Sequence, residues 1–282
     1  MLFRSTSLRA TVRERVADAA ARNEGAIPPA LDRAGGRDWG NLWAAWPSPV
    51  LDPSSELVTR TLARARAHFR EGLATYGEFH NLHHYLGFRV WQTELLRGEQ
   101  ARVVQGLYDS LAHTTNTNGG FETGVRPYAR RSVDDNLAPH GWFAAELVAL
   151  LRNMLVRESG PGLELLSAVP ARWLDPGRPT VVRGAPTKLG PVDVTLRPVR
   201  GGAVLTWKAD VPAGTPLWWR VPAAARGVRV PGLAAGASTM LLPGRAGVLR
   251  ITWRLPRPSS SFDGVTAALQ KAYRQRGLKP PA

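Results

Sequence analysis

The chain of 282 residues contains no cysteine. Disulfide bonds and thiolate metal sites are therefore excluded, while the redox compartment stays open. No apolar run approaches the roughly 18 residues that a membrane-spanning helix needs. The opening residues lack the apolar segment of a signal peptide. The sequence thus predicts no membrane partner, and it leaves the cellular location open because a preceding segment could carry a signal.

Lysine is scarce, and the first half of the chain has none. Residues 1–158 hold 19 Arg against 17 acidic residues, whereas residues 159–282 hold 18 basic residues against 5 acidic ones. The net charge of +15 therefore belongs mostly to the second half. These cations are spread through Pro/Gly-rich, strand-like sequence and do not form a basic helix or an RNA-binding signature. We predict no specific nucleic-acid partner, but docking on an anionic polymer, either polysaccharide or nucleic acid, stays an open hypothesis.

The first five residues carry no helix cap and no strand signal. Leu2–Ser5 matches the translation of a sequencing-adapter end. We expect Met1–Ser5 to be a non-native leader, in which case the natural protein continues upstream and this chain is a fragment. An ordinary frayed terminus is the alternative.

Five segments before residue 158 have the apolar spacing or the end signals of helices. The stretch Ser54-Ser55-Glu56 is typical of the cap of the second of them. The fifth is apolar on nearly all sides, which predicts a buried helix. The expected helices cover residues 7–23, 56–73, 80–96, 99–113 and 141–157.

From Gly160 onward the chain consists of short β-branched or aromatic runs separated by Gly and Pro. Several alternate with period 2, and Arg200-Gly201-Gly202 is typical of a hairpin turn. The expected strands cover residues 163–168, 180–183, 192–198, 203–209, 216–221, 228–230, 239–242 and 248–255. Strands at this spacing predict an antiparallel β-sandwich. We therefore predict an all-α domain over residues 6–158, a β-sandwich over 162–258 and a tail over 259–282 that can form a short helix.

The segment Thr114–Trp142 is the longest functional-looking loop of the sequence. Loops beyond roughly 12–15 residues are uncommon in compact domains unless they are functional or disordered. Disorder is disfavoured because the segment holds Phe121, Tyr128 and Trp142. Its polar residues are Glu122, Arg126, Arg130, Arg131, Asp134, Asp135, Asn136 and His140. This mixture predicts the floor of a site for a polar ligand.

Three tryptophans, Trp39, Trp43 and Trp46, stand within eight residues. Apolar faces of sugars pack on aromatic rings, so the three indoles could form a sugar-stacking platform. The alternative is that they fill the rim of a core.

His80, His83 and His84 have the spacing of one helix face if a helix opens at this point. They could bind a metal, hydrogen-bond a substrate, or pack and cap the helix start. No nearby carboxylate completes an established metal motif. We therefore predict no metal and no cofactor.

Four stretches together resemble a known enzyme family: Phe121-Glu122, Asn136 to Trp142, Leu151 to Gly162 and Arg183 to Trp207. The chain is similar in layout to the C-terminal half of six-hairpin, (α/α)6-toroid glycoside hydrolases, nearest to the α-L-rhamnosidase type. It departs from the family in having Phe121 where tryptophan is usual before the glutamate, and in having about five helices where six hairpins need about twelve. The resemblance implies a partial toroid followed by a β-sandwich, with the N-terminal half of the toroid missing.

The resemblance also implies roles. Glu122 would be the general base of an inverting hydrolysis of an oligosaccharide or glycoside, with the general acid in the missing sequence; Asp38 is a poor substitute for it. The residues that would contact the sugar are Phe121, Tyr128, Arg126, Asn136, His140, Trp142, His83 and Trp39. Arg126, Arg130 or Arg131 could keep Glu122 ionised, while Asp134 and Asp135 make turns or pair with arginines. The alternatives are that Glu122 is a solvated loop carboxylate, and that the chain is a catalytically inactive carbohydrate-binding or scaffolding protein.

Overall fold

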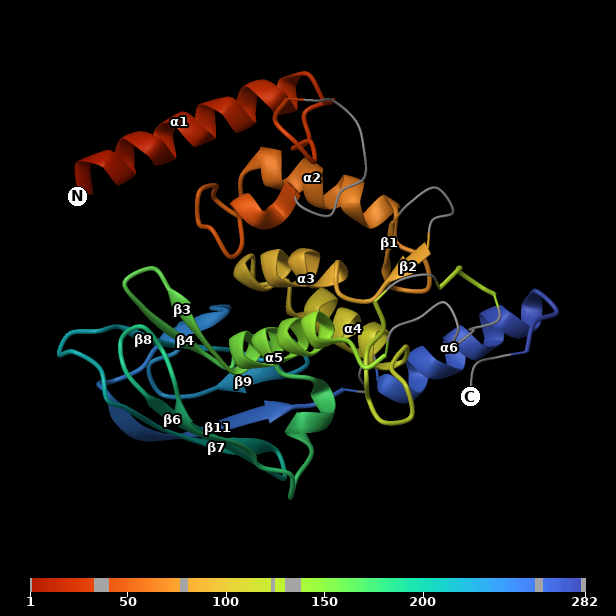
Figure 1. Ribbon diagram of the computed structural model, residues 1–282. Coiled ribbons are helices and arrows are strands. Elements are labelled where there is room, and N and C mark those ends of the chain that lie inside the picture. Colours follow the sequence, from red (N-terminus) through yellow and green to blue (C-terminus); the bar gives the residue numbers. More distant parts are fainter. Residues whose placement is uncertain are drawn as a thin grey trace. The chain divides into compact units, whose positions relative to one another are not determined.

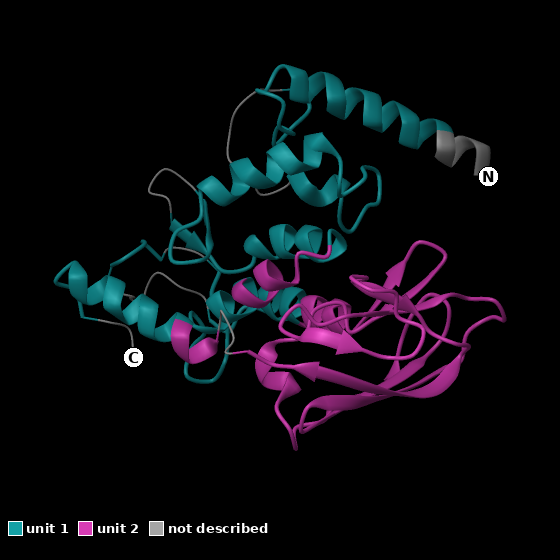
Figure 2. Cartoon of the chain, turned by 180° about the vertical axis from the view of Figure 1, so that it is seen from behind, with its two compact units in different colours: residues 1–97, 106–147, 265–282 teal, residues 98–105, 148–264 magenta. Residues whose placement is uncertain are grey.

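The computed structural model describes residues 2–32, 41–76, 81–122, 125–129, 138–256 and 261–279, with side chains from residue 7 onward. The chain divides into two compact units, which Figure 2 colours separately. Unit 1 comprises residues 1–97, 106–147 and 265–282, and unit 2 comprises residues 98–105 and 148–264. The chain thus consists of a largely helical unit and a β-rich unit.

The described part of the chain contains six α-helices and two short 3-10 helices (Figure 1). The α-helices are α1 Leu2–Ala21, α2 Glu56–Ala67, α3 Gly87–Leu96, α4 Gln100–Leu111, α5 Gly141–Leu155 and α6 Phe262–Gln275; the 3-10 helices are η1 Asn41–Ala44 and η2 Ala171–Leu174. The predicted cap of α2 at Ser54-Ser55-Glu56 is confirmed: the side chain of Ser55 accepts a hydrogen bond from the backbone N–H of Val58. A toroid is not shown by these helices and stays a prediction.

Helix α3 lies at the centre of unit 1, and nearly all of its residues are buried. Its Trp91 packs directly against Gly106 of α4, where a Cβ atom would lie 2.2 Å from the indole nitrogen. The buried carboxylate of Glu94 is paired with Arg66 of α2, with 2.8 Å between Arg66 Nε and Glu94 Oε1. Apolar packing and a paired charge together fix α3 in the unit.

A β-hairpin stands where the sequence predicts the start of the third helix. Strand β1 Ala74–Tyr76 pairs antiparallel with β2 Asn81–His83, and the N–H of Leu82 also donates to the carbonyl of Val125 (2.6 Å). The prediction of a helix from residue 80 and of an all-α segment was wrong here. Pairing with distant backbone groups overrides the local helical spacing. His83 therefore lies on a strand, and His80 is outside the described residues.

The β-rich unit 2 contains a four-stranded sheet of order β10-β8-β4-β3. Its strands are β3 Val156–Ser159, β4 Gly162–Leu165, β8 Leu217–Arg220 and β10 Thr239–Leu241. Strands β4 and β8 run parallel, with Leu163 opposite Leu217. The prediction of purely antiparallel strands was wrong for this pair, because a residue pattern does not reveal the direction of the neighbouring strand.

A five-stranded antiparallel sheet of order β5-β6-β7-β11-β9 forms the rest of unit 2. Its strands are β5 Thr180–Ala185, β6 Val192–Val199, β7 Gly202–Ala209, β9 Arg226–Arg229 and β11 Ala246–Arg254. The predicted hairpin is confirmed: Val199 faces Gly202, and Gly201 turns the chain with φ +78°. Leu163 and Trp219 of one sheet share a buried cluster with Trp207 and other residues of the other sheet. The sandwich arrangement itself stays a prediction.

One buried carboxylate lies in the four-stranded sheet. Glu164 of β4 accepts two hydrogen bonds of 2.7 Å from Arg220 of β8 and pairs with Arg157 of β3 at 3.0 Å. Burial alone would raise the pKa of Glu164, but the hydrogen bonds and charges of Arg220 and Arg157 outweigh it and lower the pKa. The three side chains thus cross-link β3, β4 and β8.

Helix α5 is not buried all round, contrary to the prediction. Its buried stripe contains Phe143, Glu146, Leu150 and Met154, which recur at helical spacing. Val148 is 65% exposed, so apolar composition alone overstated the burial. Within the described residues, no helix is long and apolar enough to cross a membrane.

Candidate functional site

An aromatic and histidine cluster lies in unit 1, centred on Tyr85. Trp142 stacks on Tyr85 with ring centroids 4.6 Å apart and an interplanar angle of 25°. The rings of His140 and His83 lie 4.9 and 4.7 Å from that of Tyr85, and Tyr76 lies 5.3 Å from His83. We call these five residues the Tyr85 cluster. It gathers side chains from β1, β2, the turn before α3 and the start of α5.

A second set of contacts fixes the segment that leads to Glu122. The N–H of Phe121 donates to His84 Nδ1 (3.4 Å), and His84 Nε2 donates to the carbonyl of Ser110 (2.7 Å). In these two bonds Nδ1 of His84 accepts and Nε2 donates. The His84 ring also packs at 4.6 Å from Phe121 and 4.1 Å from Phe143. Phe121 therefore serves as a buried anchor for its neighbour Glu122.

The backbone around this anchor is tightly packed. The N–H of His140 donates to the carbonyl of Gly120 (3.0 Å). A Cβ atom at Gly120 would lie 2.0 Å from the Phe143 ring, so only glycine fits. The two ends of the long loop are thus joined beside Glu122.

The half-buried Glu122 lies close enough to Tyr85 to affect its ionisation. Burial raises the pKa of the Tyr85 phenol, and the charges of Glu122 and Tyr76 raise it further. Among the residues that the structure describes, Glu122 makes no hydrogen bond and no ion pair. Its carboxylate is therefore available to a ligand or to water.

Two imidazole nitrogens of the Tyr85 cluster are buried and have no hydrogen-bond partner within the described ranges. They are Nδ1 of His83 and Nδ1 of His140. Burial lowers the pKa of His83 to about 4, with a contribution from the charge of His140. His83 is therefore neutral near pH 7. Buried polar atoms are normally satisfied, so these two nitrogens are candidate ligand contacts.

The lowered pKa of His83 predicts a pH-dependent stability. Since the unfolded chain protonates this histidine near pH 6.5 and the folded chain only near pH 4, stability falls as the pH drops through that window. The loss is about 3 kcal/mol. Urea unfolding of the wild type and of His83→Gln at pH 7 and pH 4.5 checks this. We expect the variant to lose less stability on acidification, and an identical loss in both proteins would contradict the assignment.

A buried ion pair adjoins the cluster on the Trp142 side. Arg89 of α3 hydrogen-bonds Glu146 Oε1 of α5, and Trp142 Nε1 donates to the same oxygen (3.1 Å). Burial lowers the pKa of Arg89, and Glu146 opposes that shift. The Arg89 guanidinium also lies 4.5 Å from the ring centroid of Trp43 and 4.8 Å from that of Trp46.

Trp43 and Trp46 therefore fill one role predicted for the tryptophans, that of packing at the edge of the core. Trp43 is nevertheless 40% exposed, as is Trp142 at 39%. These indoles can still present surface to a ligand. Trp39 and Asp38 lie outside the described residues, so the structure does not place them.

Tyr128, predicted to contact the sugar, is held elsewhere in unit 1. Its ring lies 5.7 Å from that of Tyr273 in α6 and 3.8 Å from the guanidinium of Arg276. Its N–H donates to Glu71, a buried carboxylate that also accepts from the Tyr273 hydroxyl at 3.2 Å and contacts His113 Nε2 at 3.2 Å. These contacts make Tyr128 part of the anchor between the long loop and α6.

Of the remaining predicted site residues, the structure describes Arg126 but not Asn136. Arg126 is exposed and takes part in an interaction of its own. Asn136, with Arg130, Arg131, Asp134 and Asp135, lies outside the described residues. The structure brings together His83, Glu122, His140 and Trp142; the roles assigned to them stay predictions.

Sequence reasoning missed four members of this region: Tyr76, Tyr85, Arg89 and Glu146. Arg89 and Glu146 occupy helices with apolar neighbours, where a charged residue at a core position was a usable signal. Tyr76 and Tyr85 gave no such signal. In the described part of the chain no group of three or more His, Asp or Glu residues could hold a metal ion. The absence of a cofactor stays a prediction.

No protein-family model and no curated protein matches this sequence. A solved structure with some similarity is that of Ara127N-Se, a GH127 β-L-arabinofuranosidase from Geobacillus stearothermophilus T6. The TM-score is 0.37 and the identity 12%, over 70% of this chain and 35% of that one. This chain thus spans about a third of the length of that protein. A similarity of this size identifies neither a substrate nor a mechanism.

Proposed function

We propose that the chain is a carbohydrate-active protein that binds a sugar at the Tyr85 cluster, with Glu122 as the general base of an inverting glycoside hydrolysis. The observation that supports it most is the position of Glu122 beside the stacked Tyr85–Trp142 pair, without an ion-pair partner among the described residues. The proposal includes a partial (α/α)6 toroid of the α-L-rhamnosidase type followed by a β-sandwich.

The chemistry of the cluster suits a sugar. Exposed indoles of Trp142 and Trp43 offer flat apolar faces on which a sugar ring can pack. The Nδ1 atoms of His83 and His140 offer hydrogen bonds to hydroxyl groups. Ligand sites commonly combine apolar and aromatic walls with a few placed polar groups.

Glu122 suits the part of the base. An ionised carboxylate can take a proton from a water molecule that attacks the anomeric carbon. Inversion needs a second carboxyl group roughly 6.5–9.5 Å away that donates a proton to the leaving group. In this proposal that acid is supplied by upstream sequence, as the family resemblance implies.

A second candidate is a carbohydrate-binding protein without catalytic activity. It is favoured by the hydrogen bonds of Glu146, the other carboxylate near Trp142. Its Oε1 accepts hydrogen bonds from both Arg89 and Trp142, which suits a fixed acceptor better than a proton donor. Hydrolysis by the chain joined to that upstream sequence separates the two candidates, because only the first produces a free reducing end.

The binding claim predicts the effect of Trp142→Ala. Loss of the stacked indole should weaken the binding of an oligosaccharide by about tenfold, since aromatic contacts contribute roughly 0.5–1.5 kcal/mol beyond area burial and 1.4 kcal/mol is tenfold. A glycan array identifies a ligand, and isothermal titration calorimetry of the intact chain measures its affinity.

The control is Trp218→Ala, which removes a half-buried indole of β8 in unit 2. It should leave the affinity unchanged. Equal affinities for wild type and Trp142→Ala would exclude the Tyr85 cluster as the sugar site. Binding without release of sugar would favour the second candidate.

A further inference from the structure

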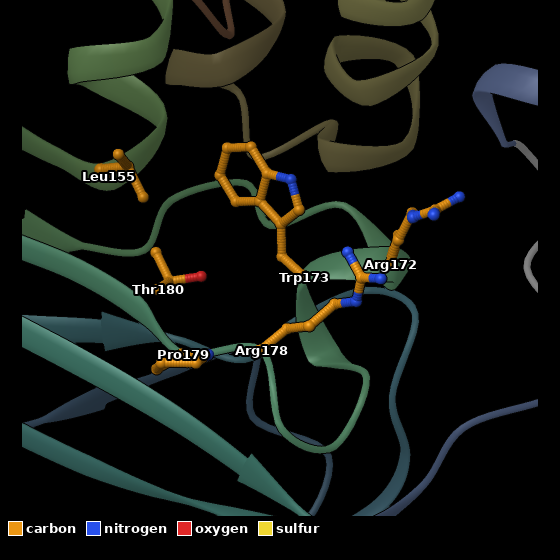
Figure 3. A pocket seen from close by; sticks show the side chains of 6 residues that line it. All are labelled: Leu155, Arg172, Trp173, Arg178, Pro179 and Thr180. Atoms are coloured by element: carbon orange, nitrogen blue, oxygen red, sulfur yellow. The ribbon is translucent and has the colours of Figure 1, made fainter.

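A separate pocket of about 350 Å³ lies within unit 2 (Figure 3). Its walls come from the last residue of α5, from η2 and from the start of β5. The lining residues are Leu155, Arg172, Trp173, Arg178, Pro179 and Thr180. A volume near the lower end of the range for ligand sites, roughly 300–1,000 Å³, suits a ligand of one or two rings.

The apolar wall of the pocket is anchored. Leu155 and Trp173 both pack against the hydrophobic core of unit 2. The backbone N–H of Trp173 also donates to the carbonyl of Pro170 (2.9 Å). The indole is therefore held in place while one part of it stays in the pocket, and a fixed aromatic face can receive a flat ligand at low entropic cost.

Arg178 is the main cation of the pocket. Its side chain is exposed and extends toward Arg172 and the backbone end of Trp173 (Figure 3). Its guanidinium makes no hydrogen bond and no ion pair with any residue that the structure describes. A guanidinium presents a planar fork of donors that matches a carboxylate.

Arg172 contributes less. Its guanidinium points away from Thr180 and Pro179 in Figure 3 and lies 3.8 Å from the carboxylate of Asp263. Asp263 is the one carboxylate with a described contact to a lining residue, and it faces this outer arginine. Thr180 adds a hydroxyl group that can donate or accept.

The charge of the unit that holds the pocket also favours an anion. Residues 159–264, which belong to unit 2, carry 14 basic and 5 acidic residues. An excess of one sign raises the local concentration of ligands of the other sign and speeds their association.

We propose that this pocket binds one uronic acid unit of an acidic carbohydrate. The sugar ring packs on the indole of Trp173, its carboxylate pairs with the Arg178 fork, and the hydroxyl of Thr180 contacts a ring hydroxyl. The anion site follows from the pocket itself; the choice of a sugar over another anion that contains a ring rests on the proposed function.

The test is saturation-transfer NMR of the intact chain with four probes: galacturonate, glucuronate, galactose and adenosine monophosphate. We expect saturation transfer to the two uronates and little to galactose. Arg178→Ala should weaken uronate binding by about ten- to a hundredfold, because hydrogen bonds to charged groups are the strong ones. Arg178→Lys keeps the charge but lacks the planar fork of donors. Its affinity for the uronates should lie between those of Arg178→Ala and the wild type.

Arg200→Ala is the matched control, since it removes an exposed arginine from the β6–β7 turn outside the pocket. An equal loss of uronate affinity in Arg178→Ala and Arg200→Ala would overturn the site. Equal binding of galactose and galacturonate would also overturn it. Arg178-dependent binding of adenosine monophosphate, tighter than that of either uronate, would overturn the choice of a sugar.

The outcome is independent of the Tyr85 cluster. Trp142→Ala should leave uronate binding at Arg178 unchanged. If uronate still binds at Arg178 but no oligosaccharide binds at Trp142, the result counts against the proposed function alone. Loss of Arg178-dependent binding with Trp142-dependent binding intact would count against this pocket alone.

Discussion

Replacement of Glu164 by alanine is expected to destabilise unit 2 by about 3–5 kcal/mol. The carboxylate is buried between Arg157 and Arg220 and accepts hydrogen bonds from Arg220. Its removal leaves two mostly buried guanidiniums facing each other without a counter-charge. The cost of such unpaired charges exceeds the net contribution of the original pair.

Amide hydrogen exchange, followed by mass spectrometry on peptides from β3, β4 and β8, measures this effect within unit 2. A loss of 3 kcal/mol corresponds to more than a hundredfold faster exchange. Glu56→Ala is the control, because the Glu56–Arg60 pair of α2 is 71% and 57% exposed and such pairs contribute only about 0–1 kcal/mol. Similar effects of the two substitutions would show that Glu164 does not stabilise the sheet as described.

The second large effect concerns Glu122→Gln. The amide keeps the shape of the side chain but cannot take a proton from water. If Glu122 is the general base, kcat should fall by about 10²–10⁴. KM should change little, because the indole and histidine contacts of the Tyr85 cluster remain.

Steady-state kinetics of the chain joined to the upstream sequence that supplies the acid in this proposal, on a glycoside that this longer protein hydrolyses, provides the measurement. Glu56→Gln, which alters an exposed glutamate of α2, should leave both kcat and KM unchanged. A Glu122→Gln variant with wild-type kcat would contradict the catalytic role and favour a solvated loop carboxylate. A raised KM with unchanged kcat would limit Glu122 to binding.

Most strands of unit 2 could be predicted because their signals are local; β3 could not, and its first two residues fall in the predicted fifth helix. Alternating Val192, Val194 and Leu196 face the core, and the intervening residues face outward. The cap at the start of α2 is also local, because the Ser55 side chain and the Val58 N–H that it accepts from lie within four residues. Such features depend on neighbours in the chain, which the sequence contains directly.

The features that could not be predicted depend on distant residues. The hairpin at His83 is fixed by β1 and by Val125. The parallel pairing of β4 with β8 joins segments more than 50 residues apart. Glu164 stands in an otherwise apolar strand, and nothing near it in the sequence shows that Arg220 will neutralise it.

The candidate site shows the same division. Composition of the long loop pointed to Glu122, His140 and Trp142, and His83 was predicted to contact the sugar with them. Neither pointed to Tyr85, around which the hairpin and the start of α5 gather His83, His140 and Trp142. The loop composition also included Tyr128, which packs on Tyr273 of α6. A residue list names candidates; long-range packing decides which of them meet.

The most direct test of sugar binding at the Tyr85 cluster is hydroxyl-radical footprinting of the intact chain with and without the oligosaccharide that binds most tightly on a glycan array. Side chains covered by the sugar are oxidised more slowly. We expect protection of Trp142 and Tyr76, which are 39% and 45% exposed, and no change at Trp218 of unit 2. Unchanged oxidation of Trp142 and Tyr76 in the presence of a saturating sugar would contradict binding at this cluster.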